Sequence, residues 1–264
     1  VKDEGVFSRK IIDELDNHAK SLGAKGLAWM KCKNNALDGG IARFFDSNLQ
    51  SDIISNYKLK DNSICFMIGD NSNLALKVLG SVRTKIAEML NLCDNTIFKP
   101  VWIVDFPLFK WDKEEKRFES VNHPFTAPKD SDIEKLSSNP EDVTSKGYDI
   151  VINGYEVAGG SIRIYDNKMQ KQIFEIMNMK EKEINEKFGF FIDALKFGTP
   201  PHGGIAFGFD RLVMLLCGVN NIRDVIAFPK TTSASALMED APNTIYKTQL
   251  NDLHIAIKKN EQDV

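Results

Sequence analysis

Three charged residues, Asp149, Glu156 and Arg163, are the first candidates for chemistry because their spacing is regular. Asp149 and Glu156 are seven residues apart, and Arg163 follows seven residues later. Two carboxylates on one surface can hold a hard divalent cation that bridges phosphate oxygens, and an arginine can clamp a carboxylate with two hydrogen bonds. In an extended chain an odd separation places side chains on opposite faces. A shared site therefore requires a turn or a bulge at Asn153–Gly154 or Gly159–Gly160. Solvated strand charges in weak surface salt bridges are the competing interpretation.

A second candidate is the segment from Gly204 to Leu216. Small residues alternate with large apolar ones up to Phe209, so one strand face packs while the other stays bare for a flat ligand. Asp210 and Arg211 then open an apolar helix, where the arginine and the N-terminal amides can face phosphate together. A glycine-rich core strand packed closely against a helix would show the same pattern. The segment fits neither GxGxxG nor GxxxxGK[ST], which excludes the dinucleotide and P-loop motifs.

Composition limits the partners that these residues can have. The 34 basic and 37 acidic residues give a net charge of −3, so no bulk charge attracts nucleic acid or an anionic membrane. A phosphate partner must be held by local geometry. The four cysteines form no CxxC pair, which favours a reduced, cytoplasmic chain. No apolar run approaches the roughly 18 residues that span a bilayer, and the first residues are charged, so no membrane partner is expected.

The elements that would position these groups fall into two regions of the 264 residues. Residues 1–98 form a helix-and-strand module without a chemical signature, which favours a structural or partner-binding role. Its helices are expected at 8–23, 49–57 and 73–92, and its strands at 27–32 and 64–69.

Residues 99–264 change in character. Strand patterns are expected at 101–105, 148–165 and from 203, where a strand leads into a short helix. A charged hairpin tip covers 110–119, and a long loop extends from 122 to 146. Further helices are expected at 168–177, 180–197 and 244–259.

The pattern Gly204-x-Ala206-x-Gly208-x-Asp210-Arg211 resembles motif 3 of class II aminoacyl-tRNA synthetases. Ala206 replaces the usual middle glycine and Asp210 the usual glutamate. The segments NHPFTAPKD, YDIVINGYEVAGGSIR and NIRDVIAFPKTTSA are similar to the bacterial aspartyl type of this family, and GAKGLAWMK resembles its GAD insertion domain.

The resemblance implies an α+β fold with two parts. Residues 1–98 would be a GAD-type insertion domain with a truncated N-terminal edge, and residues 99–264 the later half of an antiparallel-sheet catalytic domain. The implied activity is that of an aspartate–tRNA ligase, which activates aspartate with ATP and Mg²⁺ and transfers it to tRNA. The parent would be a homodimer.

The family's roles are carried over by position. Arg211 would be catalytic and hold the γ-phosphate of ATP. The acidic pair, Asp149 and Glu156, would bind Mg²⁺ on the phosphates, Glu156 thereby contacting ATP as well. Arg163 would recognise the side chain of aspartate, beside a loop that closes over the amino acid. The other implied contacts are Gly208, Phe209 and Asp210 along the nucleotide, and Asn122 and His123 at aspartate, where many relatives have two histidines.

Three parts of the family's architecture have no counterpart in this sequence: the OB-fold anticodon domain, motif 1 at the dimer interface, and the motif 2 arginine. The chain also begins with valine. A C-terminal fragment, inactive by itself, is therefore expected. The alternative is a non-catalytic tRNA-binding or partner-binding fragment built around the insertion domain. An amide-forming enzyme of the asparagine synthetase type is disfavoured because it would lack this insertion. Charging of tRNA(Asn) stays open.

Overall fold

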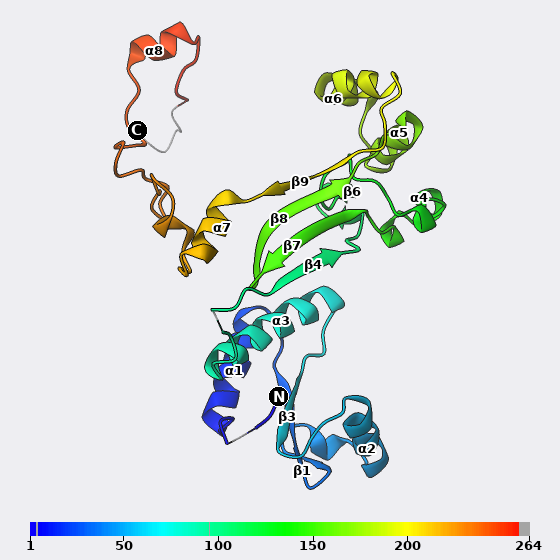
Figure 1. Ribbon diagram of the computed structural model, residues 1–264, viewed down its shortest axis with the longest axis vertical. Coiled ribbons are helices and arrows are strands. Elements are labelled where there is room, and N and C mark those ends of the chain that lie inside the picture. The colour runs from blue at the N-terminus through cyan, green and yellow to red at the C-terminus, as the bar shows by residue number, and fades with distance from the viewer. Residues whose placement is uncertain (4, 95, 259–264) are drawn as a thin grey trace. The chain divides into compact units, whose positions relative to one another are not determined.

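The computed structural model describes residues 1–3, 5–94 and 96–258. Its contacts divide the chain into two compact units, Val1–Asp94 and Asn95–Val264 (Figure 1). Helices and antiparallel sheets occur in both units, which confirms the predicted α+β class.

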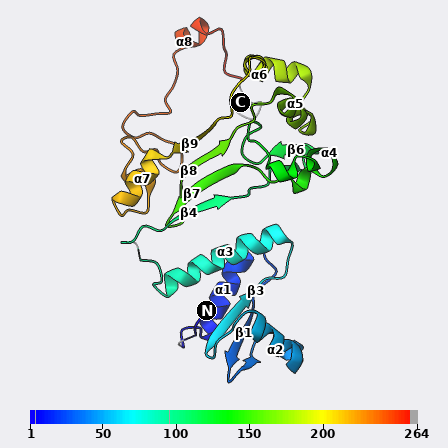
Figure 2. The same cartoon turned by 45° about the vertical axis from the view of Figure 1, so that its right-hand side comes forward.

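The first unit is a three-stranded sheet with helices packed against it (Figure 2). The strand order is β2-β1-β3, and both pairings are antiparallel. Its elements are α1 (Arg9–Ser21), β1 (Ala28–Lys33), β2 (Ala36–Asp38), the 3-10 helix η1 (Ala42–Phe44), α2 (Ser47–Asn56), β3 (Ser63–Met67) and α3 (Ser72–Met89).

Helix α1 shows why this unit folds as the sequence predicts. The Ser8 hydroxyl accepts a hydrogen bond from the Ile11 amide at 3.4 Å, which satisfies one free N–H of the first turn. Ile12, Leu15 and Ala19 lie on one face of α1 and are buried, together with Val78, Val82 and Ile86 of α3.

The second unit is built on a four-stranded antiparallel sheet in the order β4-β7-β8-β9. Its elements are β4 (Pro100–Val104), β5 (Phe109–Asp112), β6 (Arg117–Ser120), η2 (Asp130–Asp132), α4 (Lys135–Ser138), η3 (Pro140–Asp142), β7 (Gly147–Ile152), β8 (Tyr155–Ile162), α5 (Asn167–Ile176), α6 (Glu181–Leu195), β9 (Gly203–Phe207), α7 (Phe209–Leu216), η4 (Ile222–Asp224) and α8 (Lys247–Asp252).

The β7–β8 hairpin contains both devices that can reset side-chain alternation. Asn153 and Gly154 form its turn with φ values of 51° and 87°, the left-handed pair that a two-residue hairpin favours. The register then shifts, because Val151 pairs with Glu156 while Ile150 pairs with Ala158. Val157 is therefore the extra residue of a β-bulge.

Residues 122–146, predicted as a long loop, contain three short helices instead: η2, α4 and η3. Asp132 organises them. Its carboxylate accepts hydrogen bonds from the Lys135 ammonium at 2.7 Å and from the Thr144 amide at 3.0 Å. These two donors hold the pKa of Asp132 at about 2, so the carboxylate stays ionised.

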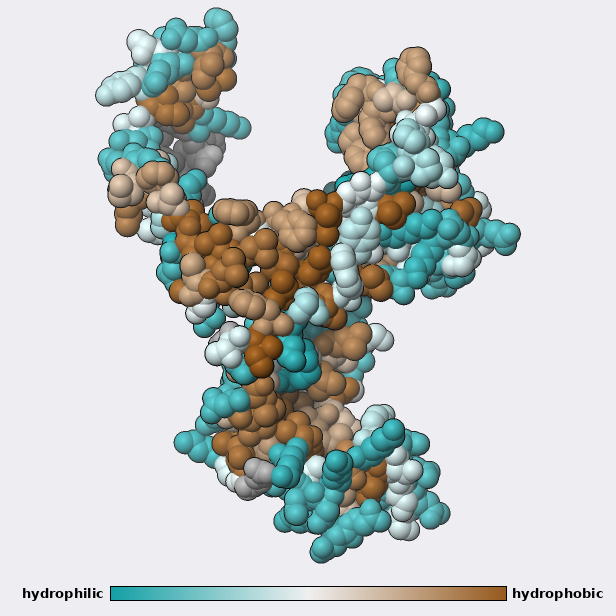
Figure 3. Space-filling model, viewed as in Figure 1, coloured by the Kyte–Doolittle hydropathy of each residue, from teal (hydrophilic) through white to brown (hydrophobic). Residues whose placement is uncertain are grey.

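The outer strands of the main sheet are exposed in this chain. Every residue of β4 and of β9 is exposed, including Trp102 at 58% and Phe207 at 55%. Figure 3 shows apolar side chains gathered over this sheet and α7.

The predicted C-terminal helix at 244–259 is too long. Helix α8 covers Lys247–Asp252 only, and His254 adopts a φ of 52°, which a right-handed helix does not allow. Residue 259 lies outside the described residues. Across the described part of the chain, no helix has the length and apolar character needed to cross a membrane.

Candidate functional site

The bulge at Val157 brings the acidic pair onto one face of the sheet. Asp149 is opposite Gly159, and Glu156 is opposite Val151. Directly paired residues share a face, as do residues two apart on one strand. Asp149 and Glu156 therefore point the same way, although strict alternation on β8 would have separated them.

Gly159 leaves room for the two carboxylates to converge. A Cβ atom at Gly159 would lie 2.8 Å from Asp149 Oδ1 and 3.7 Å from Glu156 Oε1. Partial burial raises the pKa of Asp149, and the negative charge of Glu156 raises it further. Two repelling carboxylates that share one position fit a divalent cation, whose charge would remove the repulsion.

Arg211 is fixed beside this pair. Its guanidinium Nη1 donates a 2.6 Å hydrogen bond to the Glu156 carbonyl oxygen and lies 3.9 Å from the Glu156 carboxylate. The Gly208 amide donates to the Val157 carbonyl at 2.8 Å, so the strand-to-helix turn is tied to the bulge. Phe209 and Asp210 begin α7 and are exposed. This region thus presents one arginine and two carboxylates at the N-terminal end of α7.

Arg163 lies on the same face as the acidic pair. It follows the last residue of β8 and is four residues beyond Gly159. Its amide donates to the His202 carbonyl at 2.9 Å, which continues the β8–β9 pairing, so regular alternation gives Arg163 and Gly159 one direction. At about 3.3 Å per residue, the two positions are roughly 13 Å apart along the strand. The structure thus places Arg163 and the acidic pair on one face of the sheet, at two separate positions along it.

His123 and Arg163 are in direct contact. The Arg163 guanidinium Nη1 lies 3.1 Å from His123 Nδ1, which also accepts a 3.2 Å hydrogen bond from the Phe125 amide. Burial lowers the pKa of His123, and the neighbouring Arg163 charge lowers it further. A neutral imidazole results, and Nδ1 then serves as the acceptor that orients the guanidinium.

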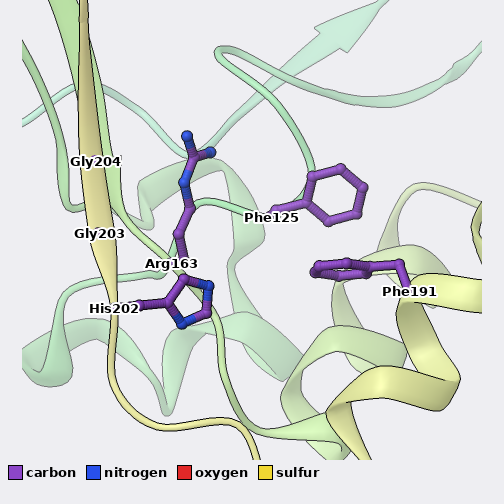
Figure 4. A pocket seen from close by; sticks show the side chains of 6 residues that line it. All are labelled: Phe125, Arg163, Phe191, His202, Gly203 and Gly204. Carbon is purple, nitrogen blue, oxygen red and sulfur yellow. The ribbon is translucent and has the colours of Figure 1, made fainter.

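A cavity of about 370 Å³ opens beside Arg163. Figure 4 shows Arg163 and His202 on one side and the rings of Phe125 and Phe191 on the other, with the strand that carries Gly203 and Gly204 beyond Arg163, on the side away from the rings. A half-buried guanidinium above an apolar wall can bind a small molecule through a carboxylate.

Asn122, predicted to contact the amino acid, lies beside Gly147 on the sheet face that carries Asp149, and the contact itself stays a prediction. It is exposed, and its Oδ1 would lie 3.4 Å from a Cβ atom at Gly147. It is not among the residues that line the cavity beside Arg163.

The acidic pair alone is an incomplete cation cage. No group of three or more His, Cys, Asp or Glu residues that could hold a metal occurs in the described ranges. A cation at Asp149 and Glu156 would need further ligands, such as water or the phosphate oxygens of a bound nucleotide.

Three supporting features were missed by sequence reasoning. The Thr126 and Ser161 hydroxyls form a buried 3.3 Å hydrogen bond at the end of residues 122–126, which we call the His123 loop. Phe125 packs against a group of phenylalanines on α5 and α6, and Gln170 of α5 bonds to the same loop. Of these three features, only the phenylalanine cluster could have been found in the sequence, from the FGFF segment of α6.

Comparison with known families assigns the chain to a family. The family described as tRNA synthetases class II (D, K and N) matches residues 17–232. The chain therefore belongs to this family of class II tRNA synthetases.

Its relatives point to one branch of that family. The aspartate–tRNA ligase of Bacillus licheniformis is 45% identical over 253 residues, which cover 96% of this chain and 43% of that protein. The aspartate–tRNA(Asp/Asn) ligase of Thermodesulfovibrio yellowstonii is 46% identical over 262 residues, covering 95% of this chain and 44% of that protein. The chain thus spans less than half the length of these curated relatives.

Among solved structures, the aspartyl-tRNA synthetase of Entamoeba histolytica is similar at 20% identity. The match covers 69% of this chain and 30% of that chain, with a TM-score of 0.41.

Proposed function

We propose that this chain forms part of an aspartate–tRNA ligase and supplies its aspartate-recognition and γ-phosphate groups. The full protein would join aspartate to ATP, releasing pyrophosphate, and then transfer the aspartyl group to tRNA. The sequence relatives support this assignment, since two of them carry the names aspartate–tRNA ligase and aspartate–tRNA(Asp/Asn) ligase.

The observation that carries the proposal is Arg163, held by His123 at the mouth of a cavity and on the face of the acidic pair. Arg163 is roughly 13 Å along the strand from Gly159, where the two carboxylates converge. This separation suits two reactants laid end to end. The amino acid would lie at Arg163, and the triphosphate would extend toward Asp149 and Glu156.

Positioning and charge neutralisation would supply most of the rate. The attacking carboxylate of aspartate is already anionic, so no protein base is required. Arg163 would bind the side-chain carboxylate of aspartate in a bidentate contact. Asp149 and Glu156 would hold Mg²⁺, which neutralises phosphate charge when bound. Arg211 would bind the γ-phosphate, with Gly208, Phe209 and Asp210 alongside the nucleotide.

We also propose that residues 1–98 are a GAD-type insertion domain and that residues 99–264 belong to the catalytic domain. The division of contacts after Asp94 supports a boundary near this point. A cytoplasmic homodimer that binds ATP and tRNA remains part of the proposal. The fragment alone would be inactive, because this sequence contains no counterpart of the motif 2 arginine.

The test is Arg163→Leu in the full-length protein that contains this chain. Loss of a desolvated carboxylate contact should lower kcat/KM for aspartate about a hundredfold or more in pyrophosphate exchange, whereas the KM for ATP should change little. Arg9→Leu is the matched control, since Arg9 forms only an exposed pair with Asp13 in the first unit. An unchanged aspartate dependence in Arg163→Leu would refute the role of Arg163. A wild-type full-length protein without aspartate-dependent exchange would instead favour the non-catalytic binding fragment.

A further inference from the structure

Gln170 on α5 is a fully buried amide that the proposed mechanism does not use. Its exposed fraction is 0%, and Phe174 follows one turn later on the same helix, also at 0%. Phe174 packs edge-on against Phe125, with ring centroids 6.4 Å apart. The helix therefore presents one amide and one ring toward the segment that carries His123.

The hydrogen bonding of Gln170 is one-sided. Its Nε2 donates to the Pro124 carbonyl at 2.8 Å, whereas its buried Oε1 has no hydrogen-bond partner among the described residues. A buried amide oxygen without a partner costs free energy, and a methionine or leucine of similar volume would pack among the phenylalanines without that cost. Packing alone therefore does not account for a glutamine at this position.

The Pro124 carbonyl lies in the middle of the His123 loop. On either side, the backbone holds the loop: the Thr126 amide donates to the His123 carbonyl at 3.1 Å, and the Ile164 amide donates to the Phe125 carbonyl at 2.9 Å. Gln170 holds the carbonyl between these two. A shift of this peptide would move His123 Nδ1, which lies 3.1 Å from the Arg163 guanidinium.

We propose that Gln170 is a positioning residue for aspartate recognition. It fixes the Pro124 peptide so that His123 orients the Arg163 guanidinium before the ligand arrives. This inference rests on the proposed function, because it assumes that Arg163 binds the carboxylate of aspartate. Small displacements of an orienting group are costly in binding and catalysis.

The experiment uses the full-length protein with Gln170→Met and Gln170→Leu. Gln172→Met is the matched control: Gln172 lies on the same helix, and its Nε2 donates to the Ser137 hydroxyl at 3.0 Å, outside the cavity. Pyrophosphate exchange gives kcat and the KM values for aspartate and ATP, and thermal unfolding is measured in parallel. We expect the KM for aspartate to rise about five- to twentyfold, with kcat and the KM for ATP within about twofold of wild type.

Three results would overturn the inference: a KM for aspartate within about twofold of wild type, an equal rise in both KM values, or two Gln170 variants that fail to fold while Gln172→Met folds. The last two would make Gln170 a general structural residue. A wild-type protein without aspartate-dependent exchange would refute the proposed function and this inference together, whereas an active wild type with unaffected variants refutes the inference alone.

Discussion

The two units differ in how much of their apolar surface they bury within this chain. In Val1–Asp94, both long helices and the sheet enclose a core of ten buried residues, including Leu15 and Ile64 at 0% exposure. In Asn95–Val264, both outer strands of the main sheet are exposed along their whole length, and Leu216 at the end of α7 is 74% exposed.

The first unit thus buries its core with its own helices and sheet, whereas the second leaves apolar strand surface exposed. Apolar strands that are exposed in one chain mark surfaces where other structure binds. The site residues belong to the second unit, so their arrangement depends on a sheet whose apolar side chains are partly uncovered. We expect the first unit to be stable by itself and the second to gain stability when the rest of the full-length protein is present.

The largest expected change in the free energy of unfolding comes from a matched pair of leucine truncations in the 264-residue chain. Leu15→Ala should cost about 2–5 kcal/mol, because it opens a cavity in a closed core. Leu216→Ala should cost less than about 0.5 kcal/mol. Urea denaturation measures both. Equal costs would show that the second unit is as well covered as the first.

A second prediction concerns Asp149 of the acidic pair, whose charge should favour Mg²⁺ binding but lower the stability of the fold. Asp149→Asn should weaken the Mg²⁺ dependence of ATP binding in the full-length protein by about tenfold or more, since one of two carboxylate ligands is lost. The pKa of Asp149 is raised in the folded state, so its ionised form disfavours folding above that pKa.

The variant should therefore be slightly more stable than wild type at pH 7, by at most about 1 kcal/mol given the solvent screening. The advantage should disappear as the pH falls below the ordinary pKa of aspartate. Thermal melts across pH test this, with Asp52→Asn on the exposed surface of α2 as control. A destabilised Asp149→Asn at pH 7 would contradict the repulsion between Asp149 and Glu156.

The smallest expected change in stability comes from a comparison of the first residues of two helices. Ser8 caps α1 through its hydroxyl, whereas Lys180 at the start of α6 makes no side-chain cap. Ser8→Ala should cost about 1 kcal/mol and Lys180→Ala close to zero. Equal changes in the free energy of unfolding would mean that the Ser8 hydrogen bond contributes nothing to the first unit.

Most elements could be predicted from sequence periodicity. The apolar stripe of α1, the strands at 28–33 and 63–67, and the strand that leads into α7 follow from local patterns of burial and capping. The turn lies at Asn153–Gly154, one of the two positions where the sequence allowed a turn or a bulge, and both residues adopt the left-handed φ values that such a turn needs.

Other features depend on tertiary contacts and left no local signal. The bulge falls at Val157, an ordinary strand residue, and not at Gly159–Gly160. Gln170 resembles any polar helix residue until α5 packs on the His123 loop. In the polar residues 122–146, Asp132 accepts hydrogen bonds from Lys135 and from the distant Thr144, a contact that local periodicity does not reveal. The prediction for the last helix was too long because nothing in its periodicity marks His254, which adopts a left-handed φ.

The most direct test of the account is aspartate-dependent pyrophosphate exchange by the 264-residue chain, alone and after addition of the rest of the full-length protein in trans. Losing one cation at the reacting phosphate typically costs about 10²- to 10³-fold in rate. The chain alone should therefore show less than about 1% of the full-length activity, and the added segment should restore exchange. Exchange by the isolated chain above that level would contradict the account, because the site would then be complete within these residues.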